Sequence, residues 1–280
     1  MTDIVKILAG ELGIKTAQVE ATINLIDEGN TIPFISRYRK EVTGSLNDEI
    51  LRQFDERLKY LRNLEEKKTQ VLSAIEEQGK LTDELKKEIE AAITLVAVDD
   101  LYRPFRPKRR TRAMIAVEKG LEGFANDIFE EKLNSDATEE AKKYLSDKEG
   151  LEVETEADAI AGAMDIIAEK ISDDATFRNK IRDLSFKQGI LTSVAKDETT
   201  ESVYENYYNF AESVSKTAGY KILAINRGEE EKILTVKLDP PVDEIIRYLE
   251  KCIIKKHNVH TEQILKDTID DAYKRLIAPS

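Results

Sequence analysis

The chain has 280 residues, of which 41% are hydrophobic and 35% are charged, and its formal net charge is −12. This composition is sufficient for a folded core and argues against nucleic-acid binding over the whole surface. A single cysteine excludes an internal disulfide, and no segment has the roughly 18 consecutive apolar residues of a membrane span. Because no signal-peptide pattern is found either, we expect a cytoplasmic protein without membrane contact.

The excess negative charge is concentrated in one part of the chain. Residues 1–120 hold 21 basic and 21 acidic residues, residues 121–175 hold 5 and 17, and residues 176–280 hold 17 of each. Because the middle segment would repel phosphates, any nucleic-acid contact is expected elsewhere. The same segment can dock a basic protein partner or simply keep the protein soluble.

The first 45 residues predict a helix-turn-helix-like unit. Apolar residues before Gly13 have helical spacing, Gly13 makes a turn, and a second helix runs from Thr16 until Gly29 ends it. The second helix offers no basic side chain after Lys15, although a DNA-reading helix would need such side chains. This favours a structural or protein-contacting role over DNA reading.

Residues 30–44, NTIPFISRYRKEVTG, form a first basic cluster on a short helix that Pro33 can begin. The cations can contact nucleic-acid phosphates. Alternatively they pair internally, for example Arg37 with Glu41 at i,i+4 spacing, which is worth little on an exposed helix. The candidate contacts in this cluster are Arg37, Arg39 and Lys40.

Residues 47–78 predict one long helix, which at 1.5 Å per residue spans on the order of 45 Å. An asparagine can cap its start, Gly79 can end it, and its apolar residues keep one stripe. A second helix over residues 82–98, with Ile93 and Val96 facing inward, is expected to follow. The two helices should form an antiparallel hairpin with the next segment at its end.

That next segment is a basic loop over residues 101–112, LYRPFRPKRRTR, with six cations and no carboxylate. Its two prolines disfavour a helix interior, so we expect an extended loop that Tyr102 and Phe105 anchor on a core. Its cations can face phosphates or pair with carboxylates such as Asp99. The candidate contacts in this loop are Arg103, Arg106, Lys108, Arg109, Arg110 and Arg112.

Residues 121–215 predict an acidic helical segment. Thr155 and Asp158 form a capping box at the start of one of its helices, whose small residues permit close helix contact. Helices are expected over residues 121–133, 138–145, 155–171 and 172–186, and a turn-like, tyrosine-rich stretch over residues 188–215.

Residues 216–280 predict a small β element followed by helices. Residues 233–238 alternate as a strand does. A hairpin that turns at Arg227-Gly228 is the simpler interpretation, and a helix up to Gly228 followed by one strand is the alternative. Two helices are expected after it, over residues 242–256 and 261–278. The last is still running where the chain stops, as in a chain cut at a domain boundary.

The chain carries no catalytic motif that we can identify. Neither a Gly-rich phosphate loop nor a Gly-x-Ser-x-Gly turn occurs. His257 and His260 are spaced as metal ligands can be, but no cysteine or carboxylate set supports them. We therefore expect no catalytic residue, no metal site and no cofactor.

Three collinear stretches resemble the bacterial Tex family of transcription accessory proteins, namely IPFISRYRKEVTG, DLYRPFRPKRRTRAMIAVEKGLE and ILAINRGEEEK. The resemblance covers nearly the whole chain and corresponds to the N-terminal helical region of those proteins. Family members continue into RNase-H-like, helix-hairpin-helix and OB-fold RNA-binding domains. One departure is local, since Thr217–Tyr220 stands where relatives often have Pro-Ser-His-Arg. The resemblance implies a non-catalytic scaffold in transcription, associated with RNA or DNA.

We therefore expect a mainly α fold with a helical bundle and four segments. The leading interpretation is a Tex-like scaffold that contacts nucleic acid weakly through the basic loop. The alternative is a protein-interaction module that docks RNA polymerase or another transcription protein without touching nucleic acid. The four segments are a helix-turn-helix-like start (1–45), a long antiparallel helical hairpin with the basic loop (46–120), an acidic helical segment (121–215), and a small β element with C-terminal helices (216–280).

Overall fold

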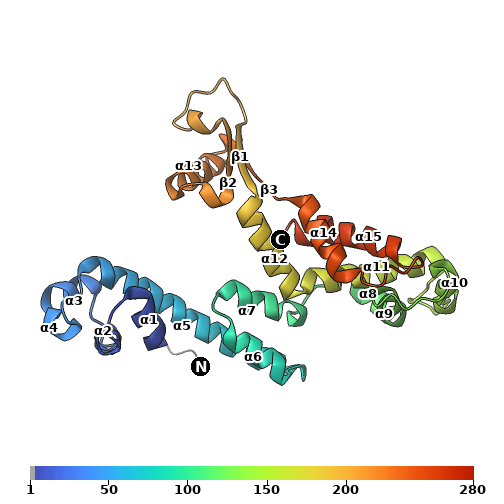
Figure 1. The fold of residues 1–280 in the computed structure, drawn as a ribbon, viewed down its shortest axis with the longest axis horizontal. Helices are drawn as coiled ribbons and strands as arrows, with labels where there is room; N and C mark the ends of the chain where they lie inside the picture. The colour runs from blue at the N-terminus through green and yellow to red at the C-terminus, as the bar shows by residue number, and fades with distance from the viewer. Residues whose placement is uncertain (1–3) are drawn as a thin grey trace. The chain divides into compact units, whose positions relative to one another are not determined.

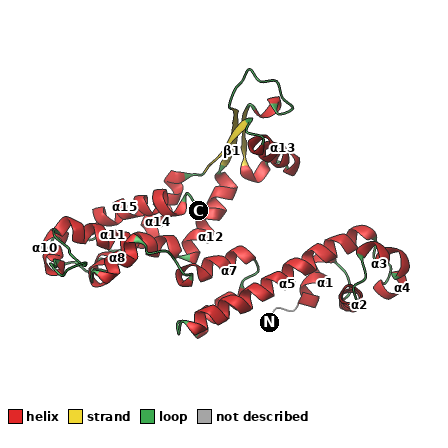
Figure 2. Cartoon of the chain, turned by 180° about the vertical axis from the view of Figure 1, so that it is seen from behind, coloured by secondary structure: helices red, strands yellow, loops and turns green. Residues whose placement is uncertain are grey.

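The computed structural model describes residues 4–280, and most of this chain is helical (Figure 1; Figure 2). The mainly α expectation is confirmed, with one three-stranded sheet among the described residues. The chain forms two compact units, Met1–Arg106 and Pro107–Ser280. The boundary between them lies inside the predicted segment 46–120, because the helix after the basic loop packs within the second unit.

Helix α5 is the support of the first unit, and its predicted extent is confirmed to within one residue. The Asn47 side chain accepts a hydrogen bond from the backbone N–H of Ile50 (2.8 Å) and so caps its start. The helices of this unit are α1 (Ile4–Leu12), α2 (Thr16–Asp27), α3 (Ile32–Tyr38), α4 (Lys40–Thr43), α5 (Asp48–Glu77), α6 (Asp83–Ala91), α7 (Leu95–Tyr102) and the 3₁₀ turn η1 (Arg103–Phe105).

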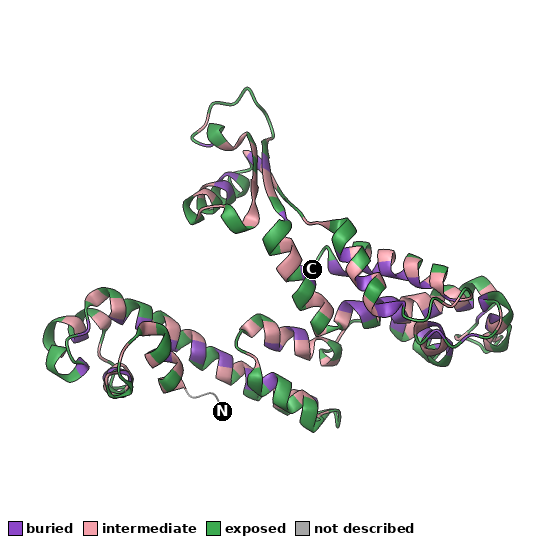
Figure 3. Cartoon of the chain, viewed as in Figure 1, coloured by how far each residue is buried: buried purple, intermediate pink, exposed green. Residues whose placement is uncertain are grey.

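The apolar stripe of α5 is buried along its length against three successive clusters (Figure 3). Leu51 packs with residues of α2 and α3, Leu61 packs with α1 and α2, and Ile75 packs with α6 and α7. One charged residue, Lys68, also lies in the stripe, where its ammonium pairs with Glu65 (3.0 Å). The first unit is therefore organised around a single helix.

The prediction of one helix over residues 82–98 is wrong. The chain leaves helical geometry at Ala92, and Thr94 caps a new helix by accepting from the backbone N–H of Ala97 (3.1 Å). Because of this break, Ile93 and Val96 are exposed rather than inward. Threonine favours such a cap over a helix interior, and this signal was present in the sequence.

The second unit contains a cluster of helices and a small sheet. Its elements are α8 (Arg112–Glu118), α9 (Glu122–Phe129), α10 (Ala137–Ala141), η2 (Lys142–Tyr144), α11 (Glu156–Asp173), α12 (Ala175–Gln188), β1 (Ile190–Ala195), η3 (Glu205–Tyr207), β2 (Asn209–Ser213), η4 (Val214–Lys216), α13 (Gly219–Glu230), β3 (Leu234–Asp239), α14 (Val242–Ile253), α15 (Glu262–Asp271) and the π-helical η5 (Ala272–Ile277).

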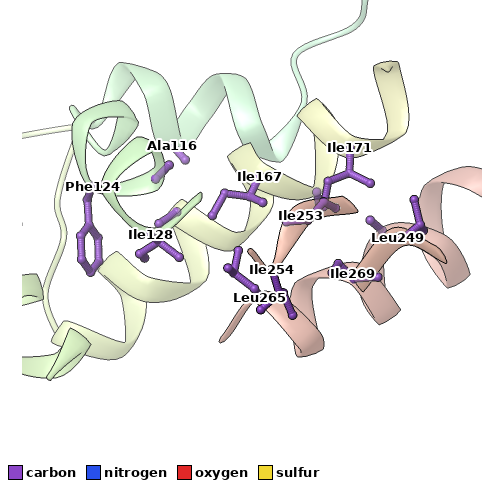
Figure 4. Packing of buried hydrophobic residues seen from close by; sticks show 14 of the residues in the cluster. Ala116, Phe124, Ile128, Ile167, Ile171, Leu249, Ile253, Ile254, Leu265 and Ile269 are labelled. Atoms are coloured by element: carbon purple, nitrogen blue, oxygen red, sulfur yellow. The ribbon is translucent and has the colours of Figure 1, made fainter. Parts of the chain in front are cut away.

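Helix α11 lies at the centre of the core of the second unit. Figure 4 shows side chains of α8, α9, α11, α14 and α15 meeting in one cluster. The predicted capping box of Thr155 and Asp158 is present at its start. At Gly162 an added Cβ would lie 2.4 Å from Leu121 Cδ1 and 3.3 Å from the Ala116 Cβ. The small residues of α11 therefore allow the close contact that their pattern predicted.

The sheet corrects two predictions. Its order is β2-β1-β3 with antiparallel neighbours, so the stretch 188–215 holds two strands rather than turns alone. A hairpin at Arg227-Gly228 is also wrong, because both residues belong to α13 and only β3 follows. The alternative of one helix and one strand is correct. Both strands that the pattern missed are short and depend on partners distant in the chain, which local periodicity does not reveal.

Gly228→Ala should destabilise the second unit by about 1–3 kcal/mol, because the site is overpacked by any side chain. A Cβ there would lie 2.7 Å from Leu234 Cδ1, 2.9 Å from Leu234 Cγ and 3.2 Å from Tyr204 Cγ. Gly219→Ala at the start of the same helix is the control, since nothing lies within 4 Å of its Cβ. Thermal unfolding should separate the two variants, and equal melting temperatures would contradict this packing.

Candidate nucleic-acid interface

The first basic cluster surrounds the junction of α3 and α4 in the first unit. Arg37 and Lys40 are exposed, and neither makes an ion pair within residues 4–280. The Arg39 guanidinium carbon lies 5.2 Å from the centre of the Phe34 ring, which in turn lies 5.2 Å from the Tyr38 ring. Tyr38 is 62% exposed. The cluster therefore offers cations beside an accessible aromatic face.

This cluster rests on a well-fixed base. Ile35 on the opposite face of α3 is fully buried. From α2, the Gln18 side-chain amide donates hydrogen bonds to the backbone carbonyls of Thr43 (2.9 Å) and Gly44 (3.2 Å). Gly44 adopts the left-handed conformation that ends α4, as predicted (φ 64°). The base holds the cations in place without using their charge.

Other arginines of the first unit differ from Arg37 because they are paired. Arg57 donates to both carboxylate oxygens of Glu11 at 2.7 Å, and these hydrogen bonds hold the pKa of Glu11 below its usual value. Arg62 forms the same fork with Asp27 (2.7 and 2.8 Å). These forks connect α1 and α2 to α5. The expected pairing of Arg37 with Glu41 does not form within residues 4–280.

The basic loop is less extended than predicted. Its first part forms the turn η1, because proline is tolerated in a first helical turn, and only residues 106–111 lack helical structure. The predicted anchors Tyr102 and Phe105 do pack on the core beside α5. The Gln78 side chain also donates to the Phe105 carbonyl (3.0 Å), which ties the loop to the end of α5. Arg103 lies in η1, half-buried.

Three cations of the basic loop are neutralised by carboxylates. Arg106 donates to Asp99 (3.1 Å), as the alternative of internal pairing expected. Lys108 is half-buried and contacts both Glu169 (3.1 Å) and Asp173 of α11. Arg110 pairs with Glu118 of α8. Lys108 and its two partners all lie within the second unit, so the charge of Lys108 is already compensated there.

Two cations of the basic loop remain available. Arg109 and Arg112 are exposed and have no carboxylate partner in the part of the chain that the structure describes. Arg112 lines a pocket of about 470 Å³ together with Lys119, which sequence reasoning missed. Arg112 begins α8 and Lys119 caps its end, seven residues later, and this helical spacing could have revealed Lys119. The same pocket is lined by four carboxylates, Glu152, Glu154, Asp158 and Asp165, so it is a poor site for an anion.

The candidate residues of the basic loop are divided between the two units. Arg103 and Arg106 belong to the first unit, and Lys108, Arg109, Arg110 and Arg112 belong to the second. The described residues contain no helix long and apolar enough to cross a membrane.

Comparison with known proteins gives consistent matches along the chain. Residues 2–76 match the model of the Tex-like protein N-terminal domain, and residues 132–278 match the Tex central region-like model. The chain is 45% identical to the uncharacterized protein YdcI of Bacillus subtilis, covering 98% of this chain and 38% of that protein. It is 39% identical to the transcriptional accessory protein Tex of Neisseria gonorrhoeae, covering 95% and 36%.

A human protein is also related. The chain is 30% identical to S1 RNA-binding domain-containing protein 1 of Homo sapiens, covering 99% of this chain and 29% of that protein. The chain therefore spans about a third of the length of these curated relatives. The central-region match alone covers more than half of the 280 residues, so this chain belongs to the Tex family of transcription accessory proteins.

Proposed function

We propose that the chain is the N-terminal helical scaffold of a Tex-like transcription accessory protein and that it contacts nucleic acid weakly, without catalysing a reaction. The observation that carries this proposal is a set of exposed cations without a carboxylate partner in residues 4–280. Although the chain has 55 acidic residues, these exposed side chains are hydrated rather than paired with carboxylates, so they can contact an external anion. Within the two basic clusters these cations are Arg37, Lys40, Arg109 and Arg112.

The mode of contact follows from the chemistry of these groups. Guanidinium and ammonium groups neutralise phosphates and release counterions, which gives affinity without sequence preference. At the α3–α4 junction, Tyr38 adds a surface on which an unpaired base can stack. This combination favours single-stranded nucleic acid over a duplex, whose bases are already stacked. The few cations involved make the contact weak and sensitive to salt.

One observation favours protein docking as a second candidate function. Helix α13 exposes Tyr220 and Leu223 to 69% and 73%, and such apolar side chains on one helix are typical of protein contacts. A transcription protein such as RNA polymerase is the partner class that the family relationship suggests. In that case the chain would act as an interaction module and touch no nucleic acid.

The decisive experiment measures binding of a labelled single-stranded RNA, and of DNA of the same sequence, by fluorescence anisotropy at low salt. Two double variants, Arg37→Glu with Lys40→Glu and Arg109→Glu with Arg112→Glu, should each weaken binding by about tenfold or more. The matched control is Lys86→Glu with Lys87→Glu, which makes the same charge change on exposed, unpaired lysines of α6.

The control separates local contact from overall charge. It should retain affinity to within about threefold, because only the long-range field changes. All variants should keep the parental melting temperature, since none removes an ion pair. If the control weakens binding as much as the two test variants, the cations are not contacts. If the parent binds neither RNA nor DNA, protein docking becomes the better account.

A further inference from the structure

A second group of cations lies in the second unit, around a pocket of about 560 Å³ between α14 and α15. Arg247 and Lys251 lie one helical turn apart on α14, and Lys255 lies two residues beyond the end of that helix. His257 of the connecting turn and Lys266 of α15 complete the basic lining. None of these residues belongs to the two basic clusters described above.

The pocket has an excess of positive charge. Its lining holds four permanent cations and two carboxylates, Glu250 and Glu262, which leaves a formal charge of +2. Glu262 already has partners, because Lys266 lies at 2.7 Å and His257 at 3.4 Å. Lys251 and Lys255 are exposed and form no ion pair within residues 4–280. The positive charge that is not paired with a carboxylate therefore lies on the α14 side of the pocket.

The turn that presents these side chains is held in place by a buried carboxylate. Glu131, which is 5% exposed, accepts hydrogen bonds from the backbone N–H groups of Lys255 and Lys256 at 2.7 Å and of Asn258 at 3.2 Å. Burial alone would raise the pKa of Glu131, but these three donors outweigh it and the pKa is lowered. The carboxylate thus stays charged and fixes the turn.

The turn also carries backbone strain. His257 has a φ of 50°, in the left-handed region that non-glycine residues seldom adopt. Such strain persists only where surrounding contacts impose it, and it is concentrated at functional sites. A lysine at a helix C-terminus can be explained by the helix dipole alone. That explanation does not cover Arg247, which lies a turn earlier, or the strained residue that lines the pocket.

We propose that the α14–α15 pocket binds a phosphate group. The Arg247 guanidinium can form a fork with two phosphate oxygens, and the ammonium groups of Lys251 and Lys255 add point charges beside it. The phosphate can come from a nucleic-acid backbone or from a free phosphate or mononucleotide. The inference is independent of the basic clusters, because its residues lie on other helices and it can hold whether or not those clusters bind nucleic acid.

The two histidines provide a direct readout for the full chain. His257 lines the pocket whereas His260 does not. In proton NMR, the imidazole Cε1–H signal of His257 therefore reports on the pocket, and that of His260 serves as an internal control. Titration with inorganic phosphate at fixed pH should move the His257 signal to saturation and leave the His260 signal nearly in place. A His260→Asn variant assigns the two signals. Chloride at matched ionic strength should produce no saturable change.

Lys251→Gln with Lys255→Gln should weaken phosphate binding by about tenfold or more, since two charge-assisted contacts are lost. Lys86→Gln with Lys87→Gln is the matched control and should bind phosphate as the parent does. Unchanged binding in the pocket variant, or an equal shift with chloride, would overturn the proposal.

Adenosine monophosphate and an RNA without terminal phosphates then distinguish the two sources of the bound phosphate. RNA displacing phosphate indicates the backbone, and displacement by the nucleotide alone indicates free phosphate.

Discussion

Leu61→Asp should lower the free energy of unfolding of the first unit by about 5 kcal/mol or more, through loss of a buried side chain and burial of a charge. Leu61 is 2% exposed and packs against Leu8, Val19 and Leu58. The new carboxylate would therefore lie among apolar side chains. Since domains are stable by only about 5–15 kcal/mol, much of this unit should unfold at room temperature.

Asn63→Asp is the control for this prediction, because it adds the same charge on the exposed side of the same helix. Its effect should stay within about 0.5 kcal/mol, as for most surface substitutions. Urea denaturation followed by circular dichroism measures both variants. If Leu61→Asp were no less stable than Asn63→Asp, helix α5 could not be the buried support of the first unit.

Lys108→Glu should destabilise the second unit by about 2–4 kcal/mol, because it removes a largely buried charge partner and adds a like charge. The Lys108 side chain is 24% exposed, and its partners Glu169 and Asp173 are 23% and 13% exposed. Thr111 also donates to Glu169 (3.3 Å), so the substitution disturbs a connected network. The three carboxylates would repel one another beside α11 and release the basic loop.

The adjacent residue supplies the control for Lys108. Arg109→Glu makes the same reversal at an exposed side chain that has no carboxylate partner in residues 4–280, so its effect on stability should be below about 0.5 kcal/mol. Urea denaturation should therefore separate two neighbouring charge reversals. An equal loss of stability in both variants would mean that Arg109 also takes part in the ion pairs of the basic loop. Arg109 would then not be available to contact nucleic acid.

The elements that sequence predicts well are those with local determinants. The start of α5 follows from the Asn47 cap, and the start of α11 follows from the capping box of Thr155 and Asp158. The apolar stripe of α5 is long enough for its helical spacing to be distinguished from the two-residue alternation of a strand. All of these signals lie within a few residues of the feature that they specify, so no tertiary contact is needed to read them.

The elements that sequence misses depend on distant partners. Strand β1 pairs with β3, so that Val194 lies opposite Thr235, and neither strand is stable without the other. The break before Thr94 is supported from α5, where Lys68 donates to the Glu90 carbonyl (2.9 Å) and the Tyr60 hydroxyl accepts from the backbone N–H of Leu95 (3.2 Å). Helical periodicity alone continues through this break.

The candidate interface shows the same division. Composition identifies the basic residues, but only the fold distinguishes Lys108, which is paired with α11, from Arg109, which is not. The partners of Lys108 lie more than sixty positions further along the chain. Spacing within the loop therefore cannot separate structural cations from available ones. The basic pocket between α14 and α15 was overlooked because its cations come from separate helices.

The measurement that tests the central claim most directly is the salt dependence of RNA affinity for the parent and for a variant with Arg37, Lys40, Arg109 and Arg112 changed to glutamine. For single strands, each phosphate contact contributes about −0.7 to the slope of log K against log salt. The parent should show a steep negative slope, and the quadruple variant should lose between about two and three units of it. An identical slope in the two proteins, or the absence of RNA binding by the parent, would contradict the account.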